Sequence, residues 1–294
     1  RHPRVSGTII SVLMGIALVV ALWPGSMQVH FIDVGQGDST LVITPHGRSI
    51  LVDAGGSLGI QNTFDIGERV VVPYLRHYGV NTLDWLILTH NHQDHAGGAG
   101  AVAEFIGIRQ VLLHQEGADK STAILQLNRA MQGKNLHEAD SVKVIRLDGV
   151  TVTLYQAGEK QTAENAKSKG GRSSSENGRS TVARIEYGRH SFLLTGDLEG
   201  DSETRIGKND MRPSTVLKVG HHGSRKSTQL VFLERVGPQY AVISVGADNR
   251  FGHPAPETLH RLQEWPVSLY RTDRDGAVVF RSDGETLTVE RTVH

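Results

Sequence analysis

The stretch THNHQDHAGG, residues 89–98, carries the strongest signal in the chain. It places His90, His92, Asp94 and His95 within six residues, directly after the apolar run LDWLILTH, which predicts a buried strand. Neutral imidazoles and carboxylates suit Zn, Mn or Fe, and a turn leading into a helix lets alternate side chains converge on two neighbouring points. The Gly97–Gly98 pair permits close backbone approach. The stretch therefore predicts a metal site.

Later stretches supply further candidate ligands at the ends of other strands. Asp197 ends FLLTGD, and HHGS at 221–224 follows TVLKVG. Because a strand directs alternate side chains to opposite faces, only one of His221 and His222 is expected to enter the metal site, and the sequence leaves open which. His253 in FGHP follows the next strand, where it either donates a proton or contacts a phosphate oxygen, or stabilises its own turn.

The composition limits the chemistry. The 294 residues include 31 basic and 31 acidic side chains and no cysteine. A disulfide framework, a thiolate zinc site, an iron–sulfur cluster and a cysteine nucleophile are excluded, so any metal must be held by histidine and carboxylate. The balanced charge provides no global basic field, and binding to nucleic acid would need a local patch or bound cations.

The remaining pattern indicates an α+β domain. Strands open the chain after residue 26 (MQVHFIDV, STLVITP, RSILVDAGG) and then alternate with helices expected near 66–77, 121–131, 228–236 and 256–263. The polar run 158–180 predicts a long mobile loop. Since LLTGD after this loop completes the site begun before it, residues 27–294 are expected to form one domain.

The N-terminus has a different character. No charged residue occurs between Val5 and Val29, and Arg1 and Arg4 precede this apolar stretch. Residues 1–26 are therefore predicted to contain a transmembrane helix with its N-terminus in the cytoplasm and the remaining chain outside. A cleaved signal peptide is disfavoured because no small-x-small site follows, and a buried core helix is the other alternative. The chain begins at Arg rather than Met, which suggests the end of a longer membrane protein.

Two sets of motifs resemble known families. LVDAGG (51–56), THNHQDHAGG, LLTGD and HHGS resemble, in that order, the successive metal motifs of the metallo-β-lactamase superfamily. FIDVGQGDS (31–39), FGHPAPETL (251–259) and RTDRDGAVVF (271–280) resemble the C-terminal extracytoplasmic domain of ComEC-type DNA-internalisation competence proteins. The resemblance covers nearly everything after residue 26. It implies a four-layer αββα fold, preceded by one transmembrane helix and an upstream channel region, with the site at one edge of two packed sheets.

The resemblance also implies a ligand set and roles for two divalent metal ions, Zn or Mn. His90 and His92 would hold the first metal and Asp94 and His95 the second, with Asp197 between them and one ligand from His221 or His222. Asp94, His222 and His253 are the expected catalytic residues, whereas Asp38 and Asp53 are expected to be structural anchors behind the ligands. The superfamily usually has a further histidine before the bridging aspartate. His114, His137 and His190 are candidates, but none lies in a glycine-histidine-threonine context, which leaves the first metal under-coordinated or absent, and ENGRS at 176–180 loosely resembles the competence-type pattern there.

These features lead to one principal functional hypothesis and two alternatives. The principal one is a phosphodiesterase or nuclease, anchored in the cell membrane with its catalytic domain outside, that hydrolyses DNA, expected to be single-stranded, during uptake. Arg172, Arg179, Arg225 and Lys226 lie in or beside the site loops and would follow the DNA backbone, or are ordinary solvated charges. The alternatives are a metal-dependent hydrolase of small esters, such as a lactone or a phosphorylcholine ester, and a non-catalytic domain that binds or gates DNA.

Overall fold

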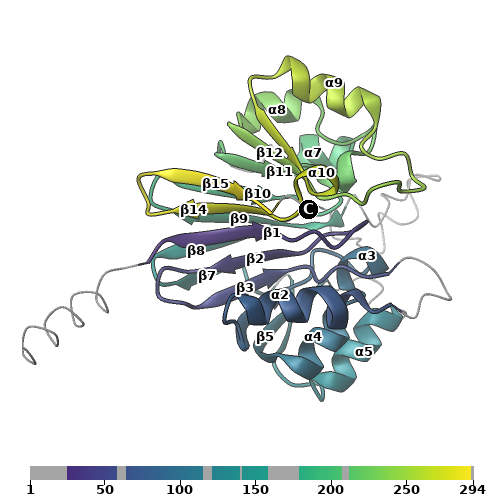
Figure 1. The fold of residues 1–294 in the computed structure, drawn as a ribbon, viewed down its shortest axis with the longest axis vertical. Helices are drawn as coiled ribbons and strands as arrows, with labels where there is room; N and C mark the ends of the chain where they lie inside the picture. Colours follow the sequence, from purple (N-terminus) through teal and green to yellow (C-terminus); the bar gives the residue numbers. More distant parts are fainter. Residues whose placement is uncertain are drawn as a thin grey trace, which may run out of the picture.

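A computed structural model describes residues 25–57, 64–114, 121–139, 141–157, 179–206 and 212–292. It contains two β-sheets packed face to face, with helices on both outer sides (Figure 1). The predicted transmembrane helix falls on residues 1–24, and most of the predicted 158–180 loop falls on residues 158–178, so both lie outside the described residues. Within the described ranges, none of the helices has the length and apolar character needed to cross a membrane.

The first sheet has eight strands in the order β15-β14-β1-β2-β3-β4-β5-β6. The opening strands β1, β2 and β3 form the predicted antiparallel meander, whereas β3, β4, β5 and β6 run parallel. The strands are β1 (Met27–Phe31), β2 (Thr40–Ile43), β3 (Ser49–Val52), β4 (Thr82–Ile87), β5 (Gly107–Leu113), β6 (Leu136–Glu138), β14 (Val278–Ser282) and β15 (Leu287–Arg291).

The second sheet has seven strands in the order β13-β12-β11-β10-β9-β8-β7. Its last four strands in sequence, β10 to β13, run parallel. The strands are β7 (Val144–Leu147), β8 (Val150–Gln156), β9 (Thr181–Tyr187), β10 (His190–Leu194), β11 (Val216–Lys218), β12 (Tyr240–Ile243) and β13 (Ser268–Arg271).

Helices cover the outer face of each sheet. On the first sheet lie the π-helical turn η1 (Gly67–Val71), α2 (Val72–His77), α3 (Gln93–Ala96), α4 (Ala99–Phe105) and α5 (Thr122–Ala130). On the second lie α7 (Asp201–Ile206), α8 (Leu230–Val236) and α9 (Pro256–Glu264), while the short turns η3 (Gly220–Gly223) and α10 (Thr272–Asp275) end strands. The layering is that of the four-layer αββα arrangement.

Apolar side chains between the sheets hold the layers together. Phe31 and Phe280 from the first sheet and Phe192 from the second are fully buried there. The ring centroids of Phe31 and Phe280 are 6.0 Å apart, and those of Phe192 and Phe280 are 5.7 Å apart, both in edge-to-face geometry. Burying a side chain of this size stabilises the fold by about 1.5–3 kcal/mol, and edge-to-face pairs add to this.

Most predicted elements are present, with two kinds of difference. A helix was expected to follow the turn of the metal motif, and the structure has two short ones there, α3 and α4, whereas α7 was not expected because its sequence is short and polar. The HHGS segment was treated as the end of a strand, but β11 ends at Lys218 and a tight turn follows. The parallel strands β3 to β6 and β10 to β13 deliver the loops after them to one edge of the molecule, where the predicted ligands lie.

Candidate metal centre

Two groups of metal-type donors meet at the edge where the parallel strands end. Asp94, His95, Asp197 and His222 form one group, in which the donor atoms all lie within 4.8 Å of one another. His90 and His92 form the other group with the same Asp197. The structure thus brings together all the expected ligands except His221. Asp197, which is 1% exposed, is the side chain that both groups share.

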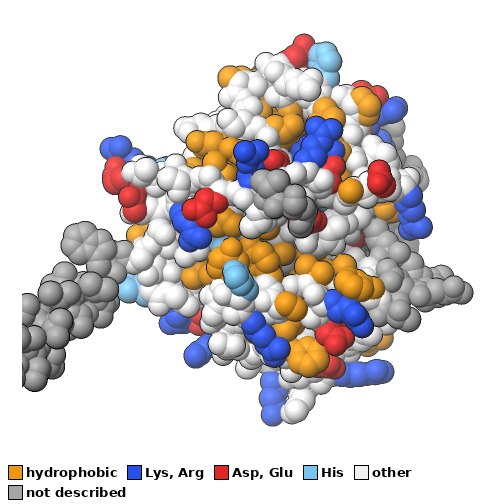
Figure 2. All heavy atoms as spheres, in the orientation of Figure 1, with side chains coloured by type: hydrophobic (Ala, Val, Ile, Leu, Met, Phe, Trp, Pro, Cys, Tyr) orange, Lys and Arg blue, Asp and Glu red, His pale blue; other side chains and the backbone are white. Residues whose placement is uncertain are grey.

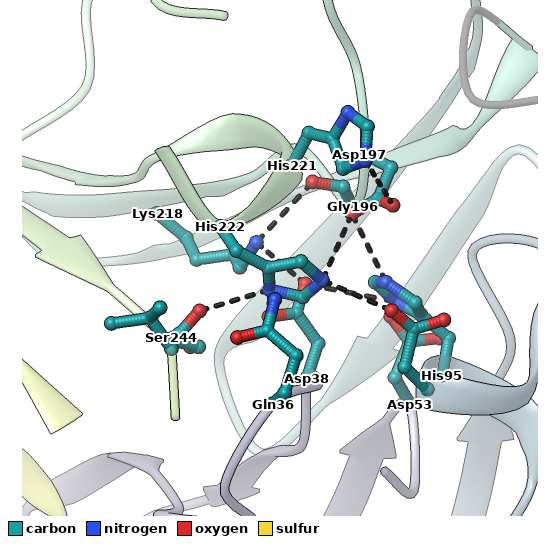
Figure 3. A network of polar contacts seen from close by, with 12 residues as sticks. Gln36, Asp38, Asp53, His95, Gly196, Asp197, Lys218, His221, His222 and Ser244 are labelled. Carbon is teal, nitrogen blue, oxygen red and sulfur yellow. Dashed lines mark hydrogen bonds and ion pairs between the residues drawn. The ribbon is translucent and has the colours of Figure 1, made fainter. Parts of the chain in front are cut away.

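The imidazole rings are held from behind by hydrogen bonds. His95 Nδ1 lies 2.8 Å from Asp53 Oδ2, and His222 Nδ1 lies 2.9 Å from the carbonyl oxygen of Ser244 (Figure 3). Both acceptors require a proton on Nδ1, so in the neutral rings Nε2 carries the lone pair. The Nε2 atom of His95 is 3.0 Å from Asp197 Oδ1. The two rings therefore direct metal-binding nitrogens toward Asp197, as metal-ligating histidines do.

Three buried donor atoms at the centre of these groups are poorly satisfied within the described residues. His90 Nε2 has no hydrogen-bond partner there, and His95 Nε2 and Asp197 Oδ1 have only each other, at 3.0 Å. Buried polar atoms are almost always satisfied, and each exception requires an explanation. A divalent cation that accepts nitrogen and carboxylate ligands would satisfy all three atoms together. The donor set and its orientation fit such an ion.

The electrostatic balance of the site also favours added cations. Asp38, Asp53, Asp94 and Asp197 lie close together around His95. Burial alone would lower the pKa of His95, but the carboxylates of Asp197, Asp53 and Asp38 outweigh this and hold that pKa well above its ordinary value. The chain thus concentrates negative charge that divalent cations would neutralise.

Asp53 has hydrogen bonds that fit the structural role expected of it. Its Oδ1 accepts a hydrogen bond from the backbone N–H of Thr89 at 2.8 Å, and its Oδ2 accepts one from the Thr89 hydroxyl at 2.7 Å. The remaining contact of Oδ2 is His95. The carboxylate therefore fixes both the backbone before the His90 motif and the orientation of one of its rings.

Asp38 is held by a buried lysine, Lys218, which sequence reasoning missed. Lys218 is 2% exposed, and its ammonium lies 2.5 Å from Asp38 Oδ2. It also donates to the carbonyl oxygen of Gly196 at 3.2 Å (Figure 3) and to that of Val219 at 3.0 Å. All three protons of the ammonium have acceptors. Although Asp38, Asp53 and His95 form a third close group of donor residues, these partners make it a supporting layer.

The two histidines of HHGS diverge because of backbone geometry. Both have left-handed φ angles, 46° at His221 and 51° at His222, so strand alternation does not apply to them. His222 joins the donor group. His221 does not, because its Nδ1 lies 2.9 Å from Glu199 Oε2, although its Nε2 lies 3.6 Å from Asp197 Oδ2. Ser224 donates its hydroxyl to the same carboxylate oxygen at 2.8 Å. Burial alone would lower the pKa of His221, but its hydrogen bond with Glu199 raises it.

His253 lies beside the cluster without joining a donor group. Its ring centroid is 5.4 Å from that of His221 and 6.5 Å from that of His222. Burial, together with His221 and His222, lowers the pKa of His253 to about 4. The ring is partly exposed and faces the same region as the donors.

The expected additional histidine is absent from the first donor group in the described ranges. His137 is engaged with Gln110 Oε1 at 2.5 Å, and His190 with the Ser282 hydroxyl at 2.7 Å. His114 lies at the end of β5 and belongs to neither group. Ser180, from the ENGRS segment, instead accepts a hydrogen bond from the backbone N–H of Asp197 at 3.3 Å.

The four basic residues expected to follow the DNA backbone differ in their exposure to solvent. Arg225 and Lys226 are exposed, and Arg225 pairs with Glu257 at 3.0 Å. Arg179 is buried and therefore offers no surface charge, while Arg172 lies outside the described residues. Basic and acidic side chains are interspersed on the face shown in Figure 2. Any local attraction for a polyanion would depend on residues beside the site and on bound cations.

Sequence reasoning also missed Thr89 and Glu199. The sequence did contain a sign of the role of Lys218. A lysine inside the apolar run TVLKVG must either point to solvent or have a buried partner of opposite charge. No comparable signal marked Glu199, whose partners His221 and Ser224 become its neighbours only through the turn.

Comparison with known proteins identifies relatives for nearly the whole chain. The family model described as the metallo-beta-lactamase superfamily matches residues 32–247. ComE operon protein 3 of Bacillus subtilis (strain 168) is 32% identical over 291 residues, which cover 94% of this chain and 36% of that protein. Competence protein ComA of Neisseria gonorrhoeae is 32% identical over 84% of this chain and 31% of its own length. The chain thus spans about a third of the length of these relatives.

A solved structure supports the fold. The metallo-beta-lactamase fold protein YhfI from Bacillus subtilis superimposes with a TM-score of 0.53 at 13% sequence identity, covering 87% of this chain and all of the other. At this identity the likeness concerns the fold alone. The family match and the competence-named relatives agree with the two resemblances noted in the sequence.

Proposed function

The chain belongs to the metallo-beta-lactamase superfamily, and from this premise we propose that it is a metal-dependent phosphodiesterase that cleaves DNA during uptake into the cell. The superfamily consists generally of metal-dependent hydrolases. The proposal includes anchoring by residues 1–26, a catalytic domain outside the membrane, and single-stranded DNA as the substrate.

The observation that carries the proposal is the pair of donor groups that share Asp197. A carboxylate common to two groups suits two neighbouring cations, of which Zn²⁺ and Mn²⁺ accept this mixture of nitrogen and oxygen ligands. When bound, two such cations supply a water of lowered pKa and neutralise charge on a phosphodiester. His90 and His92 would hold one cation and His95 and His222 the other.

The chain's own residues would then position the reaction. Asp53 and the Ser244 carbonyl fix the rings of His95 and His222, so the ligand atoms need little reorganisation. Asp94 is partly exposed, and its Oδ2 lies 3.3 Å from His222 Nε2. Its carboxylate therefore lies between the buried donor atoms and solvent. His253 faces the same region and is assigned to contact a substrate oxygen or to transfer a proton.

The choice of a phosphodiester rests on charge and on the relatives. The site's carboxylates would repel an anionic substrate unless cations were bound, which makes cleavage of DNA dependent on metal. One relative is named a competence protein, and a relative in Haemophilus influenzae that is 29% identical is named recombination protein 2. These names favour DNA over a lactone or a phosphorylcholine ester as the substrate class.

A turnover screen combined with elemental analysis tests the proposal. The full chain in detergent would be assayed with Mn²⁺ or Zn²⁺ on single-stranded DNA, duplex DNA, bis(p-nitrophenyl) phosphate, a lactone and a phosphorylcholine ester. We expect metal in the purified protein and cleavage of single-stranded DNA that a chelator abolishes. Asp197→Ala should lose both metal and activity, whereas Asp201→Ala, an exposed aspartate on α7, should retain them.

Two other outcomes of this screen would support the small-ester hydrolase or the non-catalytic domain instead. Turnover of the lactone or choline ester without cleavage of DNA would assign the small-ester class. Absence of bound metal and of all turnover, with DNA binding retained, would assign the non-catalytic class.

A further inference from the structure

An exposed aromatic side chain, Phe251, stands beside the candidate metal centre. It lies in the loop between β12 and α9 and is 46% exposed, so its ring is accessible to a binding partner. Its ring stacks on His253, with centroids 5.9 Å apart and an interplanar angle of 28°. Since the ring of His253 in turn lies beside those of His221 and His222, one intervening ring, that of His253, separates Phe251 from the candidate metal ligand His222.

Hydrogen bonds from the side chain of Asn249 hold the backbone of Phe251 in place. The Asn249 amide nitrogen donates to the carbonyl oxygens of Gly246 at 3.0 Å and His253 at 2.6 Å. Its amide oxygen accepts from the backbone N–H groups of Phe251 at 3.2 Å and His253 at 3.1 Å. One side chain thus ties both ends of the loop together. The ring is presented to solvent by a backbone that is already ordered, which lowers the entropic cost of binding a partner.

A second anchor fixes the base of the loop against the first sheet. The backbone N–H of Gly246 donates to Gln36 Oε1 at 3.2 Å, and a Cβ at Gly246 would lie 2.6 Å from the Gln36 nitrogen. The loop is therefore pressed onto the segment that carries Asp38. Its position relative to the donor groups follows from packing between the two sheets.

We propose that Phe251 is a stacking platform for a nucleobase of single-stranded nucleic acid whose phosphodiester lies at the Asp197 cluster. The inference rests on the proposed function and adds a base-binding subsite to it. Bases of a single strand have free faces, and proteins that hold such strands stack them on aromatic rings independently of sequence. In a duplex the bases are already stacked on one another, so the platform favours single strands.

The neighbouring arginine completes the subsite. The guanidinium carbon of Arg250 is 5.1 Å from the centroid of the Phe251 ring, and both side chains are exposed. An exposed cation–π contact is weaker than base–aromatic stacking, so an incoming base would displace the guanidinium. Arg250 would then be available to a phosphate of the same strand, where it adds charge attraction without reading sequence.

The test compares substrates that differ only in their bases. Initial rates of the full chain in detergent would be measured on oligothymidylate and on an abasic oligonucleotide of equal length. Phe251→Ala should lower kcat/KM for oligothymidylate about 5- to 140-fold, as expected for the loss of one stacked base. It should leave kcat/KM for the abasic strand unchanged, and Phe251→Trp should retain the preference for bases.

A matched control is available on α4, which covers the first sheet. Phe105 on α4 is also 46% exposed and also carries an arginine guanidinium over its ring, that of Arg76 at 6.0 Å. Phe105→Ala should change neither rate. An equal loss on both strands in Phe251→Ala, or no loss on either, overturns the stacking subsite while the proposed function stands. Failure of the wild-type chain to cleave either strand overturns the proposed function, and the subsite with it.

Discussion

Replacement of Lys218 by methionine tests whether the buried ion pair supports the site. The ammonium makes three contacts, to Asp38 and to two carbonyl oxygens, and both members of the pair are almost fully buried. Removing one partner of a buried pair leaves an uncompensated charge, at a cost of about 3–5 kcal/mol. We expect Lys218→Met to lower the free energy of unfolding of the metal-free chain by this amount. Urea unfolding followed by far-ultraviolet circular dichroism measures it.

The double variant Lys218→Met/Asp38→Asn makes the prediction specific. Because the second change removes the stranded charge, the double variant should be more stable than Lys218→Met alone, with a coupling energy of about 2 kcal/mol or more. Lys143→Met is the matched control, since Lys143 is exposed and its loss should alter stability by less than about 0.5 kcal/mol. A double variant as unstable as the sum of the two single variants would refute the reasoning.

Three further predictions concern other parts of the site and the fold. His222→Ala should reduce bound metal, measured by elemental analysis, whereas His221→Ala should not, because only His222 belongs to a donor group; equal loss in both would contradict the assignment. Asp53→Ala should weaken metal affinity about 10- to 100-fold while part of the activity remains at saturating metal, because Asp53 orients His95; complete and unrecoverable loss of metal would instead make it a ligand. Burial raises the pKa of Glu203 from 4.5 to about 7, against the lowering effect of its hydrogen bonds from the backbone of residues 228 and 229. The folded state thus binds the Glu203 proton more tightly than the unfolded state does. The resulting contribution to the free energy of unfolding is complete below pH 4.5 and is lost as the pH rises through about 7. Glu203→Gln should remove up to about 3 kcal/mol of that pH dependence in urea titrations, and an unchanged slope would show that Glu203 does not titrate there.

Much of the fold could be predicted because its strands are apolar runs bounded by glycine, proline or aspartate. The opening meander and the strand before His90 follow this pattern directly. The extent of the helical region after the metal motif does not follow from such a pattern. Helix α4 begins after Gly98 and is built largely of small residues, and a Cβ at Gly98 would lie 2.3 Å from the carbonyl oxygen of Ala54. The glycines of THNHQDHAGG therefore serve close packing, as predicted, although they obscure the helix that follows.

The divergence of the HHGS histidines could not be predicted, because it depends on two unusual backbone conformations. Left-handed φ angles are uncommon in residues other than glycine, and the sequence gives no reason to expect two in succession. The cause lies in tertiary packing. A Cβ at Gly220 would lie 2.2 Å from the carbonyl oxygen of Leu198, so the chain passes tightly against the loop after Asp197 and must turn there.

Four of the candidate ligands lie within six residues of the sequence and Asp197 and His222 lie far from them, and the groups that orient the ligands come from both sheets. Asp53 in the first sheet fixes His95, Ser244 in the second fixes His222, and the Lys218–Asp38 pair joins the two. The donor atoms consequently converge only when the two sheets have packed together. Metal sites of this kind are not preformed in unfolded chains, so binding energy becomes folding energy. A cation held by His95 and His222 would therefore stabilise the contact between the sheets as well as serve the chemistry at their edge.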